Sequence, residues 1–172
     1  MSGLDRSTSA LLGLGANVGD PKSAMAAALR MIDAHVQITV TIVSSLYRTP
    51  PWGKLDQPPF LNAVASVRTA LEPRTLLDAC LEAEQMLKRV RTERWGPRII
   101  DVDVLWFGDR TVDEPGLQIP HPRMQERAFV MVPLAEIDPD LILGGAAARD
   151  VASALDRTGI ERITVDGEWW RD

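Results

Sequence analysis

Two aspartates, Asp101 and Asp103, interrupt a mostly apolar segment that directly follows a loop rich in arginine. The segment, residues 99–107, is rich in β-branched and aromatic residues and predicts a buried strand. Residues i and i+2 of a strand point to the same face, so the two carboxylates would lie about 7 Å apart. Carboxylates this close repel one another unless cations or hydrogen-bond donors compensate. Two hard oxygen ligands suit Mg²⁺, which usually binds one or two carboxylates together with substrate phosphates, so the pattern predicts a magnesium site.

An edge strand with a solvated acidic face is the alternative explanation of this pair. On the expected alternation, Leu105 and Phe107 share the face of the two aspartates, and both are apolar. An apolar continuation of the face argues against exposure to water, so we favour the metal site.

A basic cluster lies directly before this strand, in a chain that is acidic overall. Its members are opposed only by Glu93, and they are Lys88, Arg89, Arg91, Arg94 and Arg98. Such a run usually forms a solvated loop, but arginine forks also match the geometry of phosphate oxygens. Next to the aspartate pair, the cluster predicts binding of a Mg²⁺-nucleotide and phosphoryl transfer, in which catalysis is mostly positioning and charge neutralisation.

The glycine-rich segment 13–20, GLGANVGD, does not have the spacing of a phosphate-binding loop. It lacks the G-x-G-x-x-G pattern and the Lys-Ser/Thr pair of a P-loop, so an ordinary P-loop kinase is excluded. We expect this segment to form a turn that needs positive φ.

Two further groups are candidates for ligand contacts. His121 lies between prolines and is followed by Arg123 and Arg127. A lone histidine is most often structural, but these arginines favour a phosphate contact. Phe60 and Asn62 would share one face of an earlier strand, where a ring and an amide can hold a flat heterocycle by stacking and paired hydrogen bonds.

Composition sets the broad class of the protein. A chain of 172 residues suits one domain, which we place over residues 1–172. The net charge of −5 provides no basic field for nucleic acid or a membrane surface, and no apolar run is long enough to cross a bilayer. Cys80 is the only cysteine, which excludes an intrachain disulfide, and no signal peptide is evident. We expect a cytoplasmic monomer.

The elements that would position these residues follow the order β-α-β-β-α-β with a C-terminal extension. We predict strands at residues 8–15, 36–42, 60–67 and 99–107, helices from residues 21 and 73, a hairpin or short strand within 111–119, a helix at 123–137 broken or kinked at Pro133, a short helix at 150–156 and a strand at 162–165. Residues 47–60 contain four prolines and predict a long loop, of the kind that often forms a functional lid. The apolar stripe of the second helix includes Leu81 and, against the pattern, Glu84. This order is that of a ferredoxin-like α+β fold.

Five segments, spread from Leu12 to Leu134, closely resemble one family, the 6-hydroxymethyl-7,8-dihydropterin pyrophosphokinases of folate biosynthesis. They are LGLGANVGD, SSLYRTPPWG, QPPFLNAV, RVRTERWGPRIIDVDVLWFG and IPHPRMQERAFVMVPL. The resemblance implies a ferredoxin-like α+β core, an antiparallel sheet with helices on both sides in three layers. It implies transfer of pyrophosphate from ATP to the pterin hydroxymethyl group, with release of AMP and use of two Mg²⁺ ions.

The resemblance also implies a role for individual residues. The metal ligands would be Asp101 and Asp103, which with Arg89 and Arg98 would be the catalytic residues. The ATP contacts would be Glu84, Arg89, Arg91, Trp95, Arg98, Val104, His121 and Arg127. The pterin contacts would be Thr49, Pro50, Trp52, Phe60, Asn62 and Phe129. Departures from the family pattern occur at Phe60, Leu81, Gly116 and Pro122, and they concern ligand contacts rather than the class of reaction.

Two functions of other classes remain as alternatives. A ferredoxin-like sheet with arginines and Phe60 could bind single-stranded nucleic acid, although the net charge and the aspartate pair argue against it. A non-catalytic nucleotide sensor would bind ATP without forming AMP. The partners we expect are therefore ATP and the pterin, with no nucleic acid and no membrane.

Overall fold

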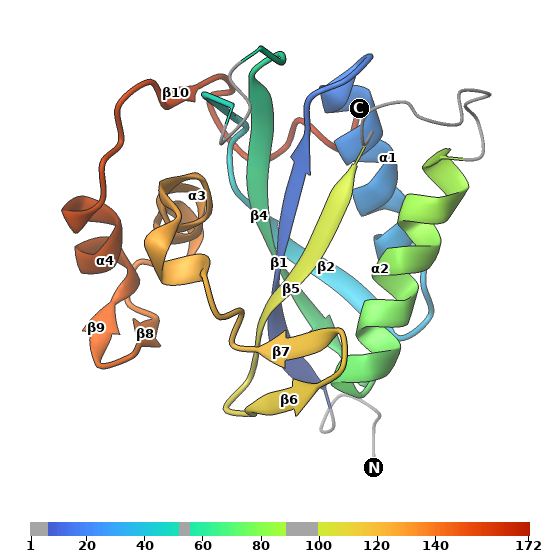
Figure 1. The fold of residues 1–172 in the computed structure, drawn as a ribbon. Helices are drawn as coiled ribbons and strands as arrows, with labels where there is room; N and C mark the ends of the chain where they lie inside the picture. The colour runs from blue at the N-terminus through green and yellow to red at the C-terminus, as the bar shows by residue number, and fades with distance from the viewer. Residues whose placement is uncertain (1–6, 52–55, 89–99) are drawn as a thin grey trace.

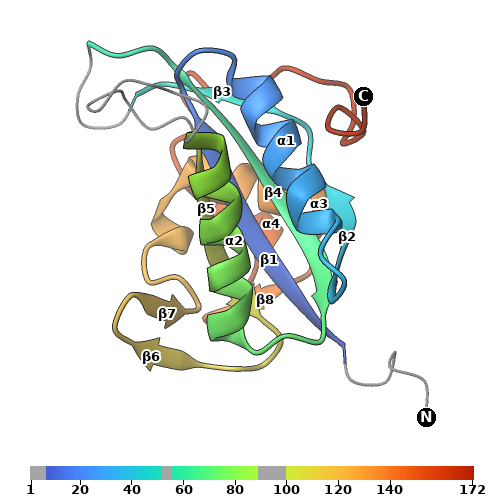
Figure 2. The same cartoon turned by 90° about the vertical axis from the view of Figure 1, so that its right-hand side faces the viewer.

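The computed structural model describes residues 7–51, 56–88 and 100–172, in which one antiparallel sheet lies between two layers of helices (Figure 1). One face of the sheet is covered by α1 (Pro21–Asp33) and α2 (Pro73–Lys88). The other face is covered by α3 (Ala128–Ile137), and α4 (Ala148–Ala154) packs against α3 on the side away from the sheet, as Figure 1 shows; Figure 2 gives the view turned by 90°. This arrangement confirms the predicted three-layer α+β fold.

The central strand of the sheet is β1 (Thr8–Ala16), which lies between β4 (Phe60–Thr69) and β5 (Asp101–Phe107). Two strands pair in succession with the other edge of β4, and these are β2 (Ile38–Val43) and β3 (Tyr47–Thr49). The short strand β10 (Glu161–Arg162) pairs in turn with β3. Every pairing is antiparallel, and the strand order is the ferredoxin-like order predicted from the sequence.

Smaller elements follow β5. They are the hairpin β6 (Val112–Glu114) and β7 (Leu117–Ile119), a 3₁₀ turn at Met124–Glu126, and the hairpin β8 (Ile142–Leu143) and β9 (Ala146–Ala147). The predicted hairpin within residues 111–119 is therefore confirmed. No helix in the described part of the chain is long and apolar enough to cross a membrane.

Successive side chains along each strand point to opposite faces of the sheet, so the buried side chains form two cores, one on each face. On β1, Leu12 and Leu14 pack into the cluster beneath α1 and α2, whereas Leu11 packs into the cluster beneath α3 and α4. The helix starts follow the sequence signals. Asp20 caps α1 by accepting a hydrogen bond from the Ser23 N–H at 3.1 Å, and Pro21 occupies the first turn, where its missing N–H costs nothing.

Two register shifts move side chains away from the predicted faces. In β2 a shift between Val40 and Ile42 buries Val43 and leaves Ile42 51% exposed, although simple alternation along the predicted strand 36–42 would put Ile42 on the buried face of Ile38 and Val40. In β5 the shift opposite Leu11 and Leu12 adds a residue at Leu105, and Phe107 consequently joins the opposite core. Leu105 and Phe107 therefore do not share a face, contrary to the prediction.

Other expectations about local structure also need correction. Gly13 and Gly15 lie within β1, so the turn extends over less of the glycine-rich segment, and only Gly19 has positive φ there, at 66°. The helix α3 continues through Pro133, and the interruption lies near Arg127, between the 3₁₀ turn and α3. The first residues of the predicted lid loop form β3. Leu81 of α2 is 40% exposed rather than part of the buried stripe.

Candidate active site

Two glycines of β1 form the floor of a hollow on the sheet face that carries α3. In the register of the sheet, Gly15 lies between Asn62 and Asp101, and Gly13 lies opposite Asp103 on the neighbouring strand. Because neither glycine has a side chain, the flanking side chains surround an open space of about 550 Å³, which we call the sheet hollow. Its lining consists of Gly13, Leu14, Gly15, Thr49, Pro50, Phe60, Asn62, Ala63, Asp101, Asp103, Leu105, Arg127, Phe129 and Val130.

A buried amide provides the polar edge of the sheet hollow. The Asn62 amide Nδ2 donates a hydrogen bond of 2.7 Å to the Thr49 hydroxyl, and both residues are less than a tenth exposed. The other amide atom, Oδ1, lies above Gly15, where an added Cβ would be only 2.9 Å from it. The orientation of the amide is therefore fixed before any ligand enters, which suits a ligand with paired donors and acceptors.

Aromatic side chains from two elements line the same hollow. Phe60 comes from β4 and Phe129 comes from α3, on the far side of the space. The guanidinium of Arg127 lies over the Phe129 ring, 5.5 Å from its centroid. Stacking and cation–π geometry of this kind hold rings in place, so the hollow has the shape and chemistry to take a flat heterocycle.

Asp101 and Asp103 lie together on the sheet hollow, which confirms that their side chains share one face. Asp103 also lines a second space of about 590 Å³, the hairpin hollow, bordered by β7 and the loop after it. The lining of the hairpin hollow consists of Leu77, Asp103, Val104, Asp113, Glu114, Pro115, Gly116, Leu117, Gln118, His121 and Pro122. Asp103 therefore borders both spaces, and Asp101 borders the sheet hollow.

The donor set of this pair fits Mg²⁺ better than a metal held by protein ligands alone. Among residues 7–51, 56–88 and 100–172, no group of three or more His, Cys, Asp or Glu side chains could hold a metal ion. In a Mg²⁺-nucleotide site the protein usually supplies one or two carboxylates. Phosphate oxygens and water fill the remaining coordination positions of the ion.

Glu84 accounts for the acidic position in the stripe of α2. Its Oε1 accepts a hydrogen bond of 2.6 Å from the backbone N–H of Val102, and its Oε2 lies 3.7 Å from Lys88 Nζ. Burial raises the pKa of the Glu84 carboxyl, and the bond from Val102 and the charge of Lys88 oppose that shift. Glu84 holds the outer edge of β5 at the residue between the two aspartates. It is not in the lining of either hollow, so its predicted contact with the nucleotide stays a prediction.

His121 lines the hairpin hollow and can donate a hydrogen bond to a ligand there. Its backbone N–H donates to the Leu105 carbonyl at 2.8 Å, and its Nδ1 accepts from the Arg123 N–H at 3.2 Å. Burial lowers the pKa of His121, so the neutral ring is favoured near pH 7. With Nδ1 acting as acceptor, the neutral tautomer carries its proton on Nε2, which suits a hydrogen bond to a phosphate oxygen.

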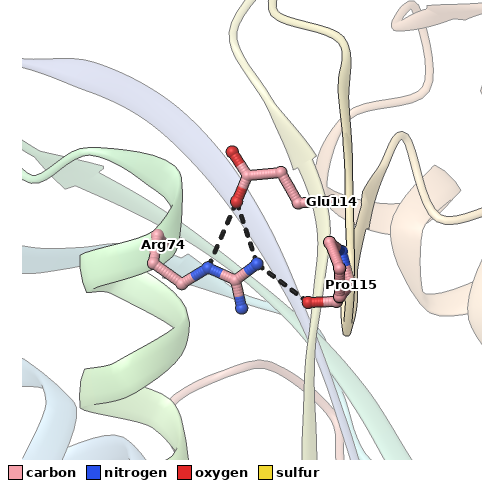
Figure 3. Close-up of polar contacts among 3 residues, drawn as sticks. All are labelled: Arg74, Glu114 and Pro115. Atoms are coloured by element: carbon pink, nitrogen blue, oxygen red, sulfur yellow. Dashed lines mark hydrogen bonds and ion pairs between the residues drawn. The ribbon is translucent and has the colours of Figure 1, made fainter.

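An ion pair attaches the wall of the hairpin hollow to α2. Arg74 donates from Nη2 to Glu114 Oε2 at 2.9 Å and to the Pro115 carbonyl at 2.9 Å (Figure 3). The pair is exposed, so it adds little to stability. Its effect is geometric, because it fixes the turn between β6 and β7 against the helix.

The structure brings most of the predicted site residues together. The sheet hollow contains the predicted residues Thr49, Pro50, Phe60, Asn62, Asp101, Asp103, Arg127 and Phe129, and the hairpin hollow contains Asp103, Val104 and His121. The predicted residues Trp52, Arg89, Arg91, Trp95 and Arg98 lie outside the described residues. The glycine floor was missed, although glycines in a strand interior are a known signal of close approach.

Comparison with known proteins identifies relatives over most of the chain. The family model described as 7,8-dihydro-6-hydroxymethylpterin-pyrophosphokinase (HPPK) matches residues 11–139. A 2-amino-4-hydroxy-6-hydroxymethyldihydropteridine pyrophosphokinase of Methylorubrum extorquens is 49% identical over 156 residues, which cover 91% of this chain and 99% of the relative. The protein of the same name from Pseudomonas aeruginosa is 43% identical over 87% of this chain and 93% of its own length.

Solved structures show the same fold at low identity. A Plasmodium falciparum HPPK-DHPS chain crystallised with SDX-DHP aligns with a TM-score of 0.70 at 17% identity and covers 86% of this chain. This chain spans only 45% of the length of that protein. A further HPPK-DHPS structure in complex with substrates aligns with a TM-score of 0.72 at 14% identity. These similarities support the arrangement of strands and helices described above.

Proposed function

The chain belongs to the 7,8-dihydro-6-hydroxymethylpterin-pyrophosphokinase family, and on that premise we propose that it transfers pyrophosphate from ATP to 6-hydroxymethyl-7,8-dihydropterin in folate biosynthesis, releasing AMP. The observation that carries the proposal is the position of Asp103, which lines both hollows. A carboxylate that borders both hollows can bind the metal ions of a nucleotide in the hairpin hollow while a pterin occupies the sheet hollow.

The sheet hollow is the pterin site in this proposal. The pterin ring lies between Phe60 and Phe129, and the amide of Asn62 pairs with the ring edge. Thr49 and Pro50 form the adjoining wall, and Trp52 adds a contact from outside the described residues. Because Thr49 already holds the Asn62 amide, binding costs little reorganisation of these groups.

The hairpin hollow and the aspartate pair form the nucleotide side. Val104 and His121 line this hollow. Arg127 lines the sheet hollow, and in this proposal it contacts the phosphates from the pterin side. Asp101 and Asp103 would hold two Mg²⁺ ions, and the ions would supply charge neutralisation at the phosphate oxygens. Glu84 keeps the backbone between these two residues in place, and its contact with the nucleotide rests on family resemblance alone.

The reaction we propose is attack by the pterin hydroxymethyl oxygen on the β-phosphorus, with AMP as the leaving group. Asp103 is a poor general base when it serves as a metal ligand, so the residues act mainly by positioning and charge. The catalytic set is Asp101, Asp103, Arg89 and Arg98. In this proposal Arg89, Arg91 and Arg98 contribute positive charge to the phosphates and Trp95 adds a further nucleotide contact, all four from outside the described residues. The monomeric state and the cytoplasmic location remain predictions.

The test is product analysis with purified protein, ATP, Mg²⁺ and the pterin alcohol. The proposal expects AMP and the pterin diphosphate in equal amounts, and both products should depend on Mg²⁺. Formation of ADP would contradict transfer of a pyrophosphoryl group. Binding of ATP with no product would favour the nucleotide sensor, and salt-dependent oligonucleotide binding without Mg²⁺ would favour the nucleic-acid binder; the family match favours neither.

A further inference from the structure

A segment late in the chain holds the strand that forms one wall of the sheet hollow. β10 pairs with β3, with Arg162 opposite Tyr47. Beside this pair, the Ile163 N–H donates to the Leu46 carbonyl at 2.7 Å, and the Leu46 N–H donates to the Thr164 hydroxyl at 3.0 Å. The chain leading into the pterin contacts is therefore held by a strand far away in sequence.

Two buried tryptophans anchor the end of the same segment. Trp169 and Trp170 are 5% and 3% exposed and belong to the core beneath α1 and α2. The Trp169 Nε1–H donates to the Ser44 carbonyl at 2.8 Å, and the Arg30 guanidinium donates to the Trp170 carbonyl at 2.8 Å. The segment is therefore attached both to β3, through β10, and to the core, through the two rings, so it acts as a fixed support.

Gly159 brings this support into direct contact with the wall of the hollow. Its φ is +82°, and an added Cβ would lie 2.7 Å from the Cγ of Pro50. Pro50 lines the sheet hollow beside Thr49, whereas Gly159 is not in the lining. The proline ring is therefore held by a residue that a ligand in the hollow does not contact.

We propose that Gly159 is a positioning residue for the acceptor: it sets the place of Pro50, and with β10 the place of Thr49, without touching the substrate. This inference rests on the proposed function, because it takes the sheet hollow as the pterin site. A side chain at position 159 would push Pro50 toward the hollow. The hairpin hollow does not include Pro50, so nucleotide binding should be unaffected.

The test compares Gly159→Ala with Gly145→Ala in the full chain. Gly145 has a φ of +87°, and an added Cβ there meets nothing within 4 Å. The two substitutions thus introduce the same backbone strain, and only one of them disturbs Pro50. Dissociation constants are measured for a non-hydrolysable ATP analogue with Mg²⁺, and for the pterin alcohol in its presence.

Gly159→Ala should weaken pterin binding by about tenfold, since small misplacements of a positioning group have effects of this order. Binding of the ATP analogue should change by less than about twofold in the same variant, a difference that falls within ordinary context dependence. Gly145→Ala should leave both constants unchanged. In a Pro50→Ala background, which removes the Cγ atom, Gly159→Ala should cause no further loss of pterin affinity.

Three outcomes would overturn the inference. They are equal pterin affinity in wild type and Gly159→Ala, an equal loss for the ATP analogue, or an undiminished loss in the Pro50→Ala background. A wild type that does not bind the pterin would overturn the proposed function and this inference together. A wild type that binds it and releases AMP, with Gly159→Ala unaffected, would overturn this inference alone.

Discussion

The carboxylate of Glu84 accepts a hydrogen bond of 2.6 Å from the backbone N–H of Val102, the residue between the two candidate metal ligands. Among the strands in the described part of the chain, β5 is at the edge of the sheet and pairs only with β1, so none of them lies beside this N–H. An edge strand presents backbone N–H and C=O groups without a strand partner, and here a side chain from α2 satisfies one of them. Glu84 therefore links the packing of α2 to the spacing of Asp101 and Asp103.

Replacing Glu84 by alanine should destabilise the protein and weaken Mg²⁺-nucleotide binding together. A buried N–H left without an acceptor costs about 1–3 kcal/mol, and the aspartates on either side lose a fixed backbone. Urea unfolding measures the first effect, and titration with a Mg²⁺-bound ATP analogue measures the second. Glu84→Gln is the matched control, because its amide oxygen can still accept from Val102. Loss of stability in the alanine variant with unchanged nucleotide affinity would disprove the positioning role.

The stability contributed by Glu84 should depend on pH in a defined direction. Burial raises the pKa of Glu84 in the folded protein, so folding favours the protonated form. This contribution is fully present below the pKa of glutamate in an unfolded chain, about 4.3, and is lost as pH rises through the higher folded value. The wild type should therefore lose stability relative to Glu84→Gln as pH rises, without Mg²⁺. A difference that grows in favour of the wild type with rising pH would contradict the direction of the shift.

A methyl group at position 15 should disturb the acceptor site through Asn62. The added Cβ would lie 2.9 Å from the Asn62 amide oxygen, and the amide has little freedom to move because its Nδ2 donates to the Thr49 hydroxyl. We expect Gly15→Ala to weaken pterin binding by about tenfold or more.

Gly13→Ala is the control for this change, because it lies on the same face of β1. Its added Cβ would meet the end of the Leu105 side chain at 3.3 Å, a longer contact than the 2.9 Å at position 15 and one with apolar atoms rather than the Asn62 amide. The Gly15→Ala loss should exceed the Gly13→Ala loss in pterin titrations. If both variants lost the same pterin affinity, the effect would come from the reduced volume of the hollow and not from displacement of the Asn62 amide.

Several parts of the fold follow from local sequence, and others depend on contacts that the sequence does not display. Asp20 and Pro21 mark the start of α1 by their own chemistry, and the alternation in β4 assigns Asn62 to the correct face. The exposed Ile42 and the reversed Phe107 result from register shifts against partner strands. A register shift is a property of two strands, so a single strand's pattern cannot reveal it.

In the candidate site, too, some features follow from local sequence and others depend on distant contacts. The i, i+2 spacing was enough to place Asp101 and Asp103 on one face, because strand geometry alone determines it. The partner of Glu84 could not be predicted, since it depends on how α2 packs against the edge of β5. The contact of Trp169 could not be predicted either, because its hydrogen-bond partner, Ser44, lies 125 residues earlier in the chain.

Each aspartate should be required for turnover but not for folding. Asp101→Asn and Asp103→Asn keep the size of the side chain and remove the charge that a Mg²⁺-nucleotide requires. We expect turnover to fall by at least about 10²-fold in each variant, with thermal unfolding close to that of the wild type. Asp109→Asn, in the exposed turn after β5, is the matched control and should retain activity. A near-normal rate in either of the first two variants would remove the metal assignment.

The fate of the β-phosphate tests the central claim most directly. ATP labelled at its β-phosphorus is incubated with the protein, Mg²⁺ and 6-hydroxymethyl-7,8-dihydropterin, and the labelled products are separated. Attack at the β-phosphorus predicts that the label moves to the pterin, in amounts equal to the unlabelled AMP released. Label that remains with the adenine nucleotide as ADP would contradict the proposed reaction.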